Sequence, residues 1–162
     1  MITSKKLVKI YRDQFGKEPY SDWLKSLKDP IVRARIRKRI SRVEEGNLGN
    51  LEPVGGVKIM RHLRNYRDAL IEDLKNPQES EAYLRIALEE YESDQNIESF
   101  LLALRNIADA QGGIGKLAEK TNLNRQNLYR ILSKTGQPKF PTMLAILHGL
   151  GFALIPQKAI AA

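Results

Sequence analysis

Residues 124–130 concentrate polar side chains that can donate and accept hydrogen bonds. The stretch holds two arginines, two asparagines, a glutamine and a tyrosine, and it has no acidic residue. An arginine guanidinium can donate two hydrogen bonds to a guanine edge, and an asparagine or glutamine amide can pair similarly with adenine. Such side chains on one exposed side of a helix are typical of a surface that reads DNA bases.

The surrounding residues predict how such a helix is held. We expect one helix over residues 114–121 and a second over 125–132. Ala118 is small enough to let the second helix cross the first closely, and Asn122 tolerates the left-handed backbone of a sharp turn. Leu123 then supplies an apolar anchor. This order of small, turn and apolar residues predicts a helix-turn-helix.

The second helix has an apolar side, which leaves its polar side exposed. Leu128, Ile131 and Leu132 have the spacing of a buried face, and Asn124 is a suitable N-cap. Backbone N–H groups over residues 112–116 are placed to meet phosphate. An ordinary helical hairpin with a polar outer surface is the alternative. The residues predicted to bind DNA are Asn124, Arg125, Gln126, Asn127, Tyr129, Arg130, Lys116 and Lys134.

The composition excludes several classes of site. Cysteine is absent, which excludes disulfides and thiolate metal sites. His62 and His148 are isolated from other ligand-type side chains, so we expect no metal site and no cofactor. No apolar run is long enough for a membrane span, and the N-terminus lacks the apolar stretch of a signal peptide. We therefore expect a cytoplasmic protein.

Charge is distributed unevenly along the chain. Residues 1–67 hold 17 basic and 7 acidic residues, whereas residues 68–162 hold 10 basic and 12 acidic residues. A basic half indicates a polyanionic partner or an acidic neighbouring segment. A merely solvated basic surface is an equal alternative on charge alone.

The basic half predicts a strand, two helices and a strand. Residues 7–12 and 57–63 alternate apolar and polar side chains, and residues 20–27 have helical apolar spacing. Asp29 and Pro30 are typical of an N-cap and a first helical turn. Two strands and two helices make a thin core, so we expect an incomplete domain. The second helix has one apolar face, formed by Val32, Ile36, Ile40 and Val43. Its other faces carry Arg33, Arg35, Arg37, Lys38, Arg39 and Arg42.

The rest of the chain predicts a series of helices. Gly151 has the position of a C′ glycine after the last of them. Residues 152–155 are a strand candidate, which would pair across a dimer or cover the core of one copy. The helices that precede or follow the helix-turn-helix are expected over residues 66–75, 79–91, 100–108 and 141–150.

The C-terminal part resembles a known family. The sequence ESFLLALRNIADAQGGIGKLAEKTNLNRQNLYRILS (98–133), followed by a proline-containing loop and LHGLGF (147–152), is similar to the Xre/Cro-type helix-turn-helix family. It is closest to the HigA-like addiction-module antidotes. Asn122 departs from the motif, which prefers glycine there. The resemblance implies a five-helix domain that binds a double-stranded DNA operator as a homodimer and regulates its own module.

The N-terminal part resembles a second family. Residues 18–61 are similar to the first half of RelE/HigB-type toxins, which are ribosome-dependent mRNA endonucleases. The similarity ends near Leu63, before the strands that carry the RNA-cutting residues of that family. Nothing near Arg33–Arg42 resembles a positioned base, and His62 alone is a weak candidate. We therefore expect no catalytic residue and no enzymatic activity.

Together these patterns predict a mainly α protein with a small incomplete α/β segment. We expect a truncated toxin-like segment over 1–64, an acidic helical connector over 65–95 and a helix-turn-helix domain over 96–156. An mRNA endonuclease fused to its own antidote, and a toxin-neutralising protein without gene control, are the alternatives. The acidic block of the connector has three possible roles. It could cover a basic toxin surface, fold back onto residues 33–42, or simply be solvated. The block comprises Glu79, Glu81, Glu89, Glu90, Glu92 and Asp94.

Overall fold

A computed structural model describes residues 6–46, 63–133 and 135–155. Most of the described chain is helical, and one small antiparallel sheet lies near the N-terminus, so the predicted mainly α fold is confirmed. In chain order the elements are β1 (Lys9–Tyr11), α1 (Pro19–Ser26), α2 (Pro30–Glu44), β2 (Leu63–Asn65), α3 (Tyr66–Asp73), α4 (Pro77–Asp94), α5 (Ile97–Ala110), α6 (Gly113–Thr121), α7 (Arg125–Ile131) and α8 (Phe140–Gly149).

Local capping sets where several helices begin and end. Asp29 Oδ1 accepts a hydrogen bond from the Ile31 N–H at 2.8 Å, and Pro30 occupies the first turn of α2, as predicted. At the end of α8, Gly151 has a φ of 86° and its N–H bonds the His148 carbonyl. The Phe152 N–H bonds the Leu147 carbonyl, which completes a Schellman motif. The predicted C′ glycine is therefore confirmed.

The predicted strand over residues 152–155 is wrong. These residues are irregular, and Leu154 and Ile155 are exposed. The N–H of Phe152 already bonds the Leu147 carbonyl in the C-cap of α8. Residue 152 therefore completes the end of that helix and does not begin a strand.

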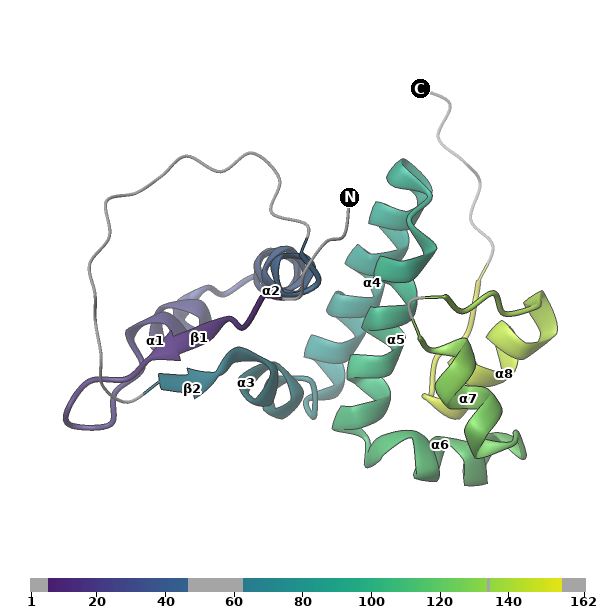
Figure 1. Ribbon diagram of the computed structural model, residues 1–162. Helices are drawn as coiled ribbons and strands as arrows, with labels where there is room; N and C mark the ends of the chain where they lie inside the picture. The colour runs from purple at the N-terminus through teal and green to yellow at the C-terminus, as the bar shows by residue number, and fades with distance from the viewer. Residues whose placement is uncertain (1–5, 47–62, 134, 156–162) are drawn as a thin grey trace.

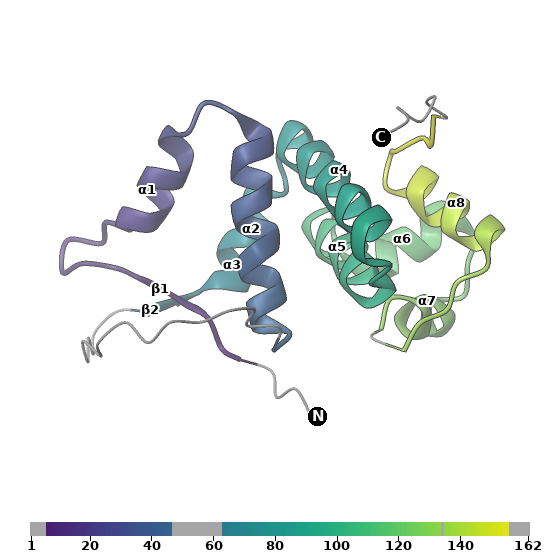
Figure 2. The same cartoon turned by 90° about the horizontal axis from the view of Figure 1, so that it is seen from above.

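The elements form two groups, one on each side of a central helix pair. Helices α4 and α5 pack side by side in the middle of the molecule (Figures 1 and 2). The α/β elements and α3 lie on one side of this pair, and α6, α7 and α8 lie on the other. In the sheet, Ile10 of β1 is in register with Arg64 of β2. Because Asn65 both ends β2 and caps α3, the chain passes directly from the sheet into the helical part.

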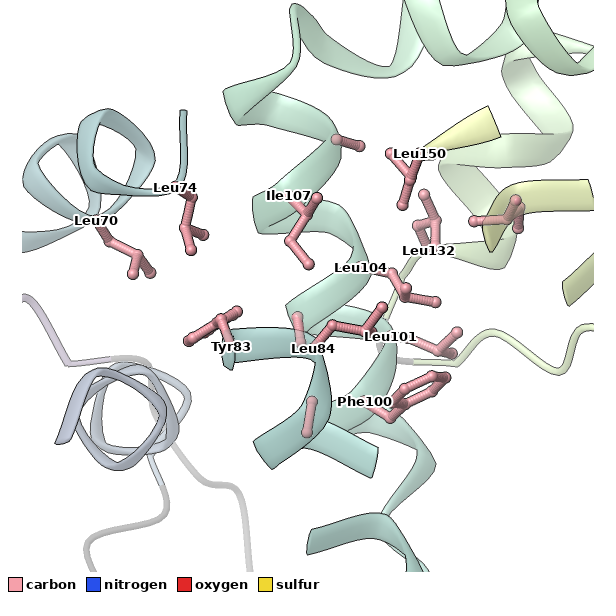
Figure 3. Packing of buried hydrophobic residues seen from close by; sticks show 14 of the residues in the cluster. Leu70, Leu74, Tyr83, Leu84, Phe100, Leu101, Leu104, Ile107, Leu132 and Leu150 are labelled. Carbon is pink, nitrogen blue, oxygen red and sulfur yellow. The ribbon is translucent and has the colours of Figure 1, made fainter. Parts of the chain in front are cut away.

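The apolar core runs through the central pair to both sides. Tyr83 of α4 and Leu101, Leu104 and Ile107 of α5 are fully buried. Figure 3 shows Leu70 and Leu74, from the α3 region, on one side of Ile107, with Leu132 and Leu150 on the other. One continuous cluster therefore includes residues of α3, α5, α7 and α8; α3 and α6 contact α5, and α7 and α8 contact α6.

Helix α2 turns its basic face, rather than its apolar face, towards the helical core. Its buried residues are Ala34, Arg37, Lys38 and Ser41, whereas Val32 is 41% exposed. This face packs on α4, where Glu79 pairs with the buried Arg37. Apolar periodicity alone does not determine the orientation of this helix, because a charged partner competes for it.

Among the described residues, no helix combines the length and the apolar character that a membrane crossing requires.

Candidate nucleic-acid interface

Two short helices and a tight turn form the candidate interface. Helix α6 ends at Thr121 and α7 begins at Arg125, and Asn122 between them has φ 56° and ψ 21°, as predicted for a left-handed turn residue. Leu123 is partly buried against the core. The Thr121 hydroxyl donates to the Leu117 carbonyl at 2.8 Å, which closes the last turn of α6. The predicted break between the two helices is confirmed.

Helix α7 is anchored by one face and exposes the other. Leu128, Ile131 and Leu132 are buried, as the spacing predicted. Asn124 Oδ1 accepts hydrogen bonds from the N–H groups of Gln126 (2.9 Å) and Asn127 (3.2 Å). Its side-chain oxygen is therefore engaged in capping α7, which leaves the amide nitrogen for other contacts.

Most of the predicted DNA-binding residues are exposed. Asn127 is half-buried on the same helix, and Lys134 lies outside the described residues. Neither arginine of α7 packs inward. The exposed members are Asn124, Arg125, Gln126, Tyr129, Arg130 and, on α6, Lys116.

The polar side chains of α7 are held in pairs along the helix. The Arg125 guanidinium lies 5.7 Å from the centre of the Tyr129 ring, and its Nη2 donates to the phenol oxygen at 3.4 Å. This hydrogen bond raises the pKa of Arg125. The Arg130 guanidinium donates to Asn127 Oδ1 at 2.8 Å. These pairings limit the rotamers of both arginines before any ligand binds.

Helix α6 contributes the backbone N–H groups of its N-terminus and one exposed lysine. Gly112 and Gly113 have φ values of 108° and 88° at its start. A Cβ added at Gly115 would lie 3.8 Å from the Arg125 guanidinium carbon, so the arginine reaches across the first turn of α6. Lys116 is exposed on α6, and its aliphatic chain lies over Gly112, where an added Cβ would be 2.9 Å from Lys116 Cδ.

Acidic side chains are absent from this end of the sequence. The last acidic residue is Glu119, and residues 120–162 hold six lysines and arginines and no aspartate or glutamate. The acidic residues of the C-terminal half therefore all lie in 68–119, and α7 and α8 contain none. An anion approaching α7 meets no fixed negative charge on this helix.

The basic residues of α2 occupy a different environment. Arg37 bonds Asp73 at 3.0 Å and also pairs with Glu79, which pairs in turn with Arg33. Arg42 contacts Glu90 at 3.3 Å and Asp94 at 2.5 Å. Of the predicted acidic block, Glu79, Glu89, Glu90 and Asp94 fold back onto residues 33–42, whereas Glu81 and Glu92 are exposed.

Burial and charge act in opposite directions on Glu79. Its removal from water works to raise the pKa, but hydrogen bonds from Arg33 and Arg37 and their charges outweigh burial and lower the pKa. The carboxylate therefore stays ionised between the two helices.

Sequence reasoning missed the burial of Lys38. This side chain is fully buried, and its Nζ donates to the Ser99 carbonyl at 2.5 Å and to the Ser99 hydroxyl at 2.8 Å. The Tyr83 hydroxyl likewise donates to Ser41 of α2 at 3.0 Å. A hydrophilic residue in a basic run carries no pattern that marks it as buried.

The structure describes one of the two histidines and shows how it is placed. His62 lies outside the described residues, and His148 is exposed in the last turn of α8. Within 6–46, 63–133 and 135–155, no group of three or more histidine, aspartate or glutamate side chains could hold a metal ion.

Comparisons with known proteins match the C-terminal part of the chain. Residues 67–158 match the family described as probable addiction module antidote protein. An uncharacterized protein of Haemophilus influenzae is 32% identical over 80 residues, which are 49% of this chain and 81% of that protein. No solved structure matches the chain. Because the family match covers more than half of the chain, the protein belongs to the probable addiction module antidote family, which indicates an antitoxin role and implies a toxin partner.

Proposed function

We propose that the protein is an antitoxin-type autoregulator that binds a double-stranded DNA operator through α6 and α7. In this proposal α6, the turn and α7 act as a helix-turn-helix of the Xre/Cro type. Helix α7 enters the major groove with its N-terminal residues first. The observation that carries the proposal is the exposed face of α7, which presents Arg125, Gln126 and Arg130 and contains no acidic side chain.

The chemistry of this face supports base reading. Arg130 and Arg125 supply guanidinium forks for guanine, and Gln126 supplies an amide for adenine. Asn127 contributes the same amide chemistry at the half-buried edge. Base contacts specify sequence, whereas phosphate contacts fix position. The backbone N–H groups at Gly113 and the Lys116 ammonium suit the second role.

We infer that the DNA-binding form is a homodimer. Helix-turn-helix proteins gain affinity and specificity by binding two half-sites about 34–36 Å apart. The N-terminal elements lie across α4 and α5 from α7, so they leave the recognition surface open in one copy (Figures 1 and 2). The operator would then contain an inverted repeat.

For the N-terminal part we propose a toxin-like remnant without catalytic activity. The order β1, α1, α2, β2 is the order of strand and helices that the resemblance to RelE/HigB-type toxins implies. The arginines that could bind RNA phosphate are instead largely paired with α3 and α4. Purified protein should leave mRNA on translating ribosomes intact, and cleavage at codons would overturn this part of the proposal.

Selection of bound duplexes from a random DNA pool tests the proposal. We expect one enriched motif, arranged as an inverted repeat. Arg39→Ala is a matched control, because Arg39 is an exposed arginine of α2 on the other side of the central pair. That variant should select the same motif. Enrichment of no motif would contradict sequence-specific binding.

A further inference from the structure

The acidic residues of α3 and α4 form a surface that fits a basic helix. We call it the acidic face, and it carries one carboxylate of α3 and four of α4. Glu79, 8% exposed, lies in the first turn of α4, and the carboxylates near the C-terminal end of α4 are more open. The acidic face consists of Asp73, Glu79, Glu89, Glu90 and Asp94.

Polar and charged side chains make up most of the buried face of helix α2, and Ala34 is the apolar residue buried among them. Arg37 and Lys38 are 2% and 0% exposed, and Arg33 and Arg42 flank them along the helix. Arginine and lysine are almost never fully buried unless they are paired. Arginine is the residue of choice for buried ion pairs, and it is enriched at interfaces between proteins.

The two sides of this contact belong to different parts of the chain. The antidote match covers residues 67–158, which include the whole acidic face, and α2 precedes it. The acidic face thus belongs to the part of the chain that matches the antidote family, whereas α2, which occupies the face, lies outside that match.

We propose that the acidic face is a docking surface for a protein that presents a basic helix, and that α2 fills it in cis. The partner helix would carry arginine or lysine at the spacing of Arg33, Arg37, Lys38 and Arg42. An intact chain is then closed to such a partner on this face while its α7 surface stays open (Figure 1). The class of partner rests on the antidote assignment, and the proposal is independent of DNA binding.

An exchange experiment with the full chain tests the proposal. A recognition sequence for a site-specific protease is inserted between residues 46 and 63, and the chain is labelled near its N-terminus and cleaved. The labelled N-terminal piece is then mixed with an excess of unlabelled cleaved chain or of unlabelled intact chain. We expect the label to pass into the cleaved chain and not into the intact chain, because α2 already occupies the face there.

Charge variants separate specific docking from general adhesion. Glu79→Gln in the cleaved chain should weaken rebinding of the N-terminal piece about tenfold or more. Glu81→Gln is the matched control, because Glu81 is exposed on α4 and has no ion pair among the described residues. It should change rebinding less than about twofold. The far-UV circular dichroism spectrum of each variant reports whether its helical part is folded.

Salt supplies a second measurement that needs no substitution. Rebinding should weaken steadily as salt rises from about 0.05 M to about 0.5 M, because ion pairs at the open end of the face are screened. The proposal is overturned if the N-terminal piece does not rebind or enters intact chain equally well. Equal effects of the two charge variants, or salt-independent rebinding, would also overturn it.

Discussion

Lys38 is a buried ammonium group whose direct hydrogen-bond partners are neutral. Burial is the largest influence on it and lowers its pKa to about 8, while the charges of Glu90 and Asp94 act in the opposite direction and Arg42 adds to the lowering. The fold thus holds a cation where water is excluded, at a cost that depends on pH.

We expect the free energy of unfolding to rise between about pH 8 and pH 10.5. In this window the folded chain has released the Lys38 proton and the unfolded chain still holds it, so stability increases with pH, by up to about 3 kcal/mol. Denaturant titrations at several pH values measure the rise. Lys38→Met should remove most of it, whereas exposed Lys25→Met should keep it. Parallel curves for the parent and Lys38→Met would show that Lys38 does not titrate in this way.

Arg130→Ala should weaken binding to the selected operator by about 1–3 kcal/mol and relax the preference at one base position. The reason is that Arg130 is exposed on α7 and is oriented by Asn127. Competition between single-base variants of the operator measures the preference. If the substitution weakened binding to random duplexes to the same extent, Arg130 would contact phosphate instead.

At the scale of the element, close packing of α8 on α6 supports the helix pair that presents α7. A Cβ at Gly149 would lie 2.4 Å from Thr121 Cγ2 and 2.9 Å from Leu117 Cδ1. Glycine therefore permits an approach between the two helices that a side chain would prevent.

Gly149→Ala should destabilise the protein by about 1–3 kcal/mol through this overpacking. Gly115→Ala is the matched control, since its Cβ would make an ordinary contact with Arg125 at 3.8 Å in the helical interior of α6. That control should be neutral or slightly stabilising. Chemical denaturation compares the two, and an unchanged midpoint for Gly149→Ala would show that the contact relaxes freely.

Elements governed by local chemistry could be predicted from the sequence. The Asp29 cap, the left-handed Asn122 and the Gly151 terminus depend on a few neighbouring residues, and each was found where expected. The orientation of α2 could not be predicted, because it depends on carboxylates of α4 far along the chain. The strand expected over residues 152–155 did not form because four apolar residues do not outweigh a helix cap.

Across the whole molecule, opposite charges divide into two regions with different roles. The carboxylates of α3 and α4 meet the cations of α2, and the sequence after Glu119 is left with positive charge alone. Ion pairs within the chain thus neutralise part of the N-terminal positive charge, whereas the charged side chains of α7 are all basic.

Glu79→Gln should reduce stability at neutral pH by about 3 kcal/mol, because it leaves Arg37 buried beside a neutral group. The lowered pKa of Glu79 means that its ionisation stabilises the parent above pH 4.5 and that this contribution is lost as pH falls below 4.5. The variant should therefore lose less stability on acidification than the parent. Exposed Glu81→Gln should behave as the parent does, and identical acid profiles for all three proteins would exclude this role for Glu79.

The most direct measurement is the affinity of the purified full chain for its selected duplex and for a scrambled duplex of equal length and composition. Both are measured at one physiological salt concentration, so that phosphate contacts contribute equally. Sequence-specific recognition by α7 predicts binding to the selected duplex that is tighter by about a thousandfold or more. Equal affinity for the two duplexes, or no binding to either, would contradict the proposed operator-binding function.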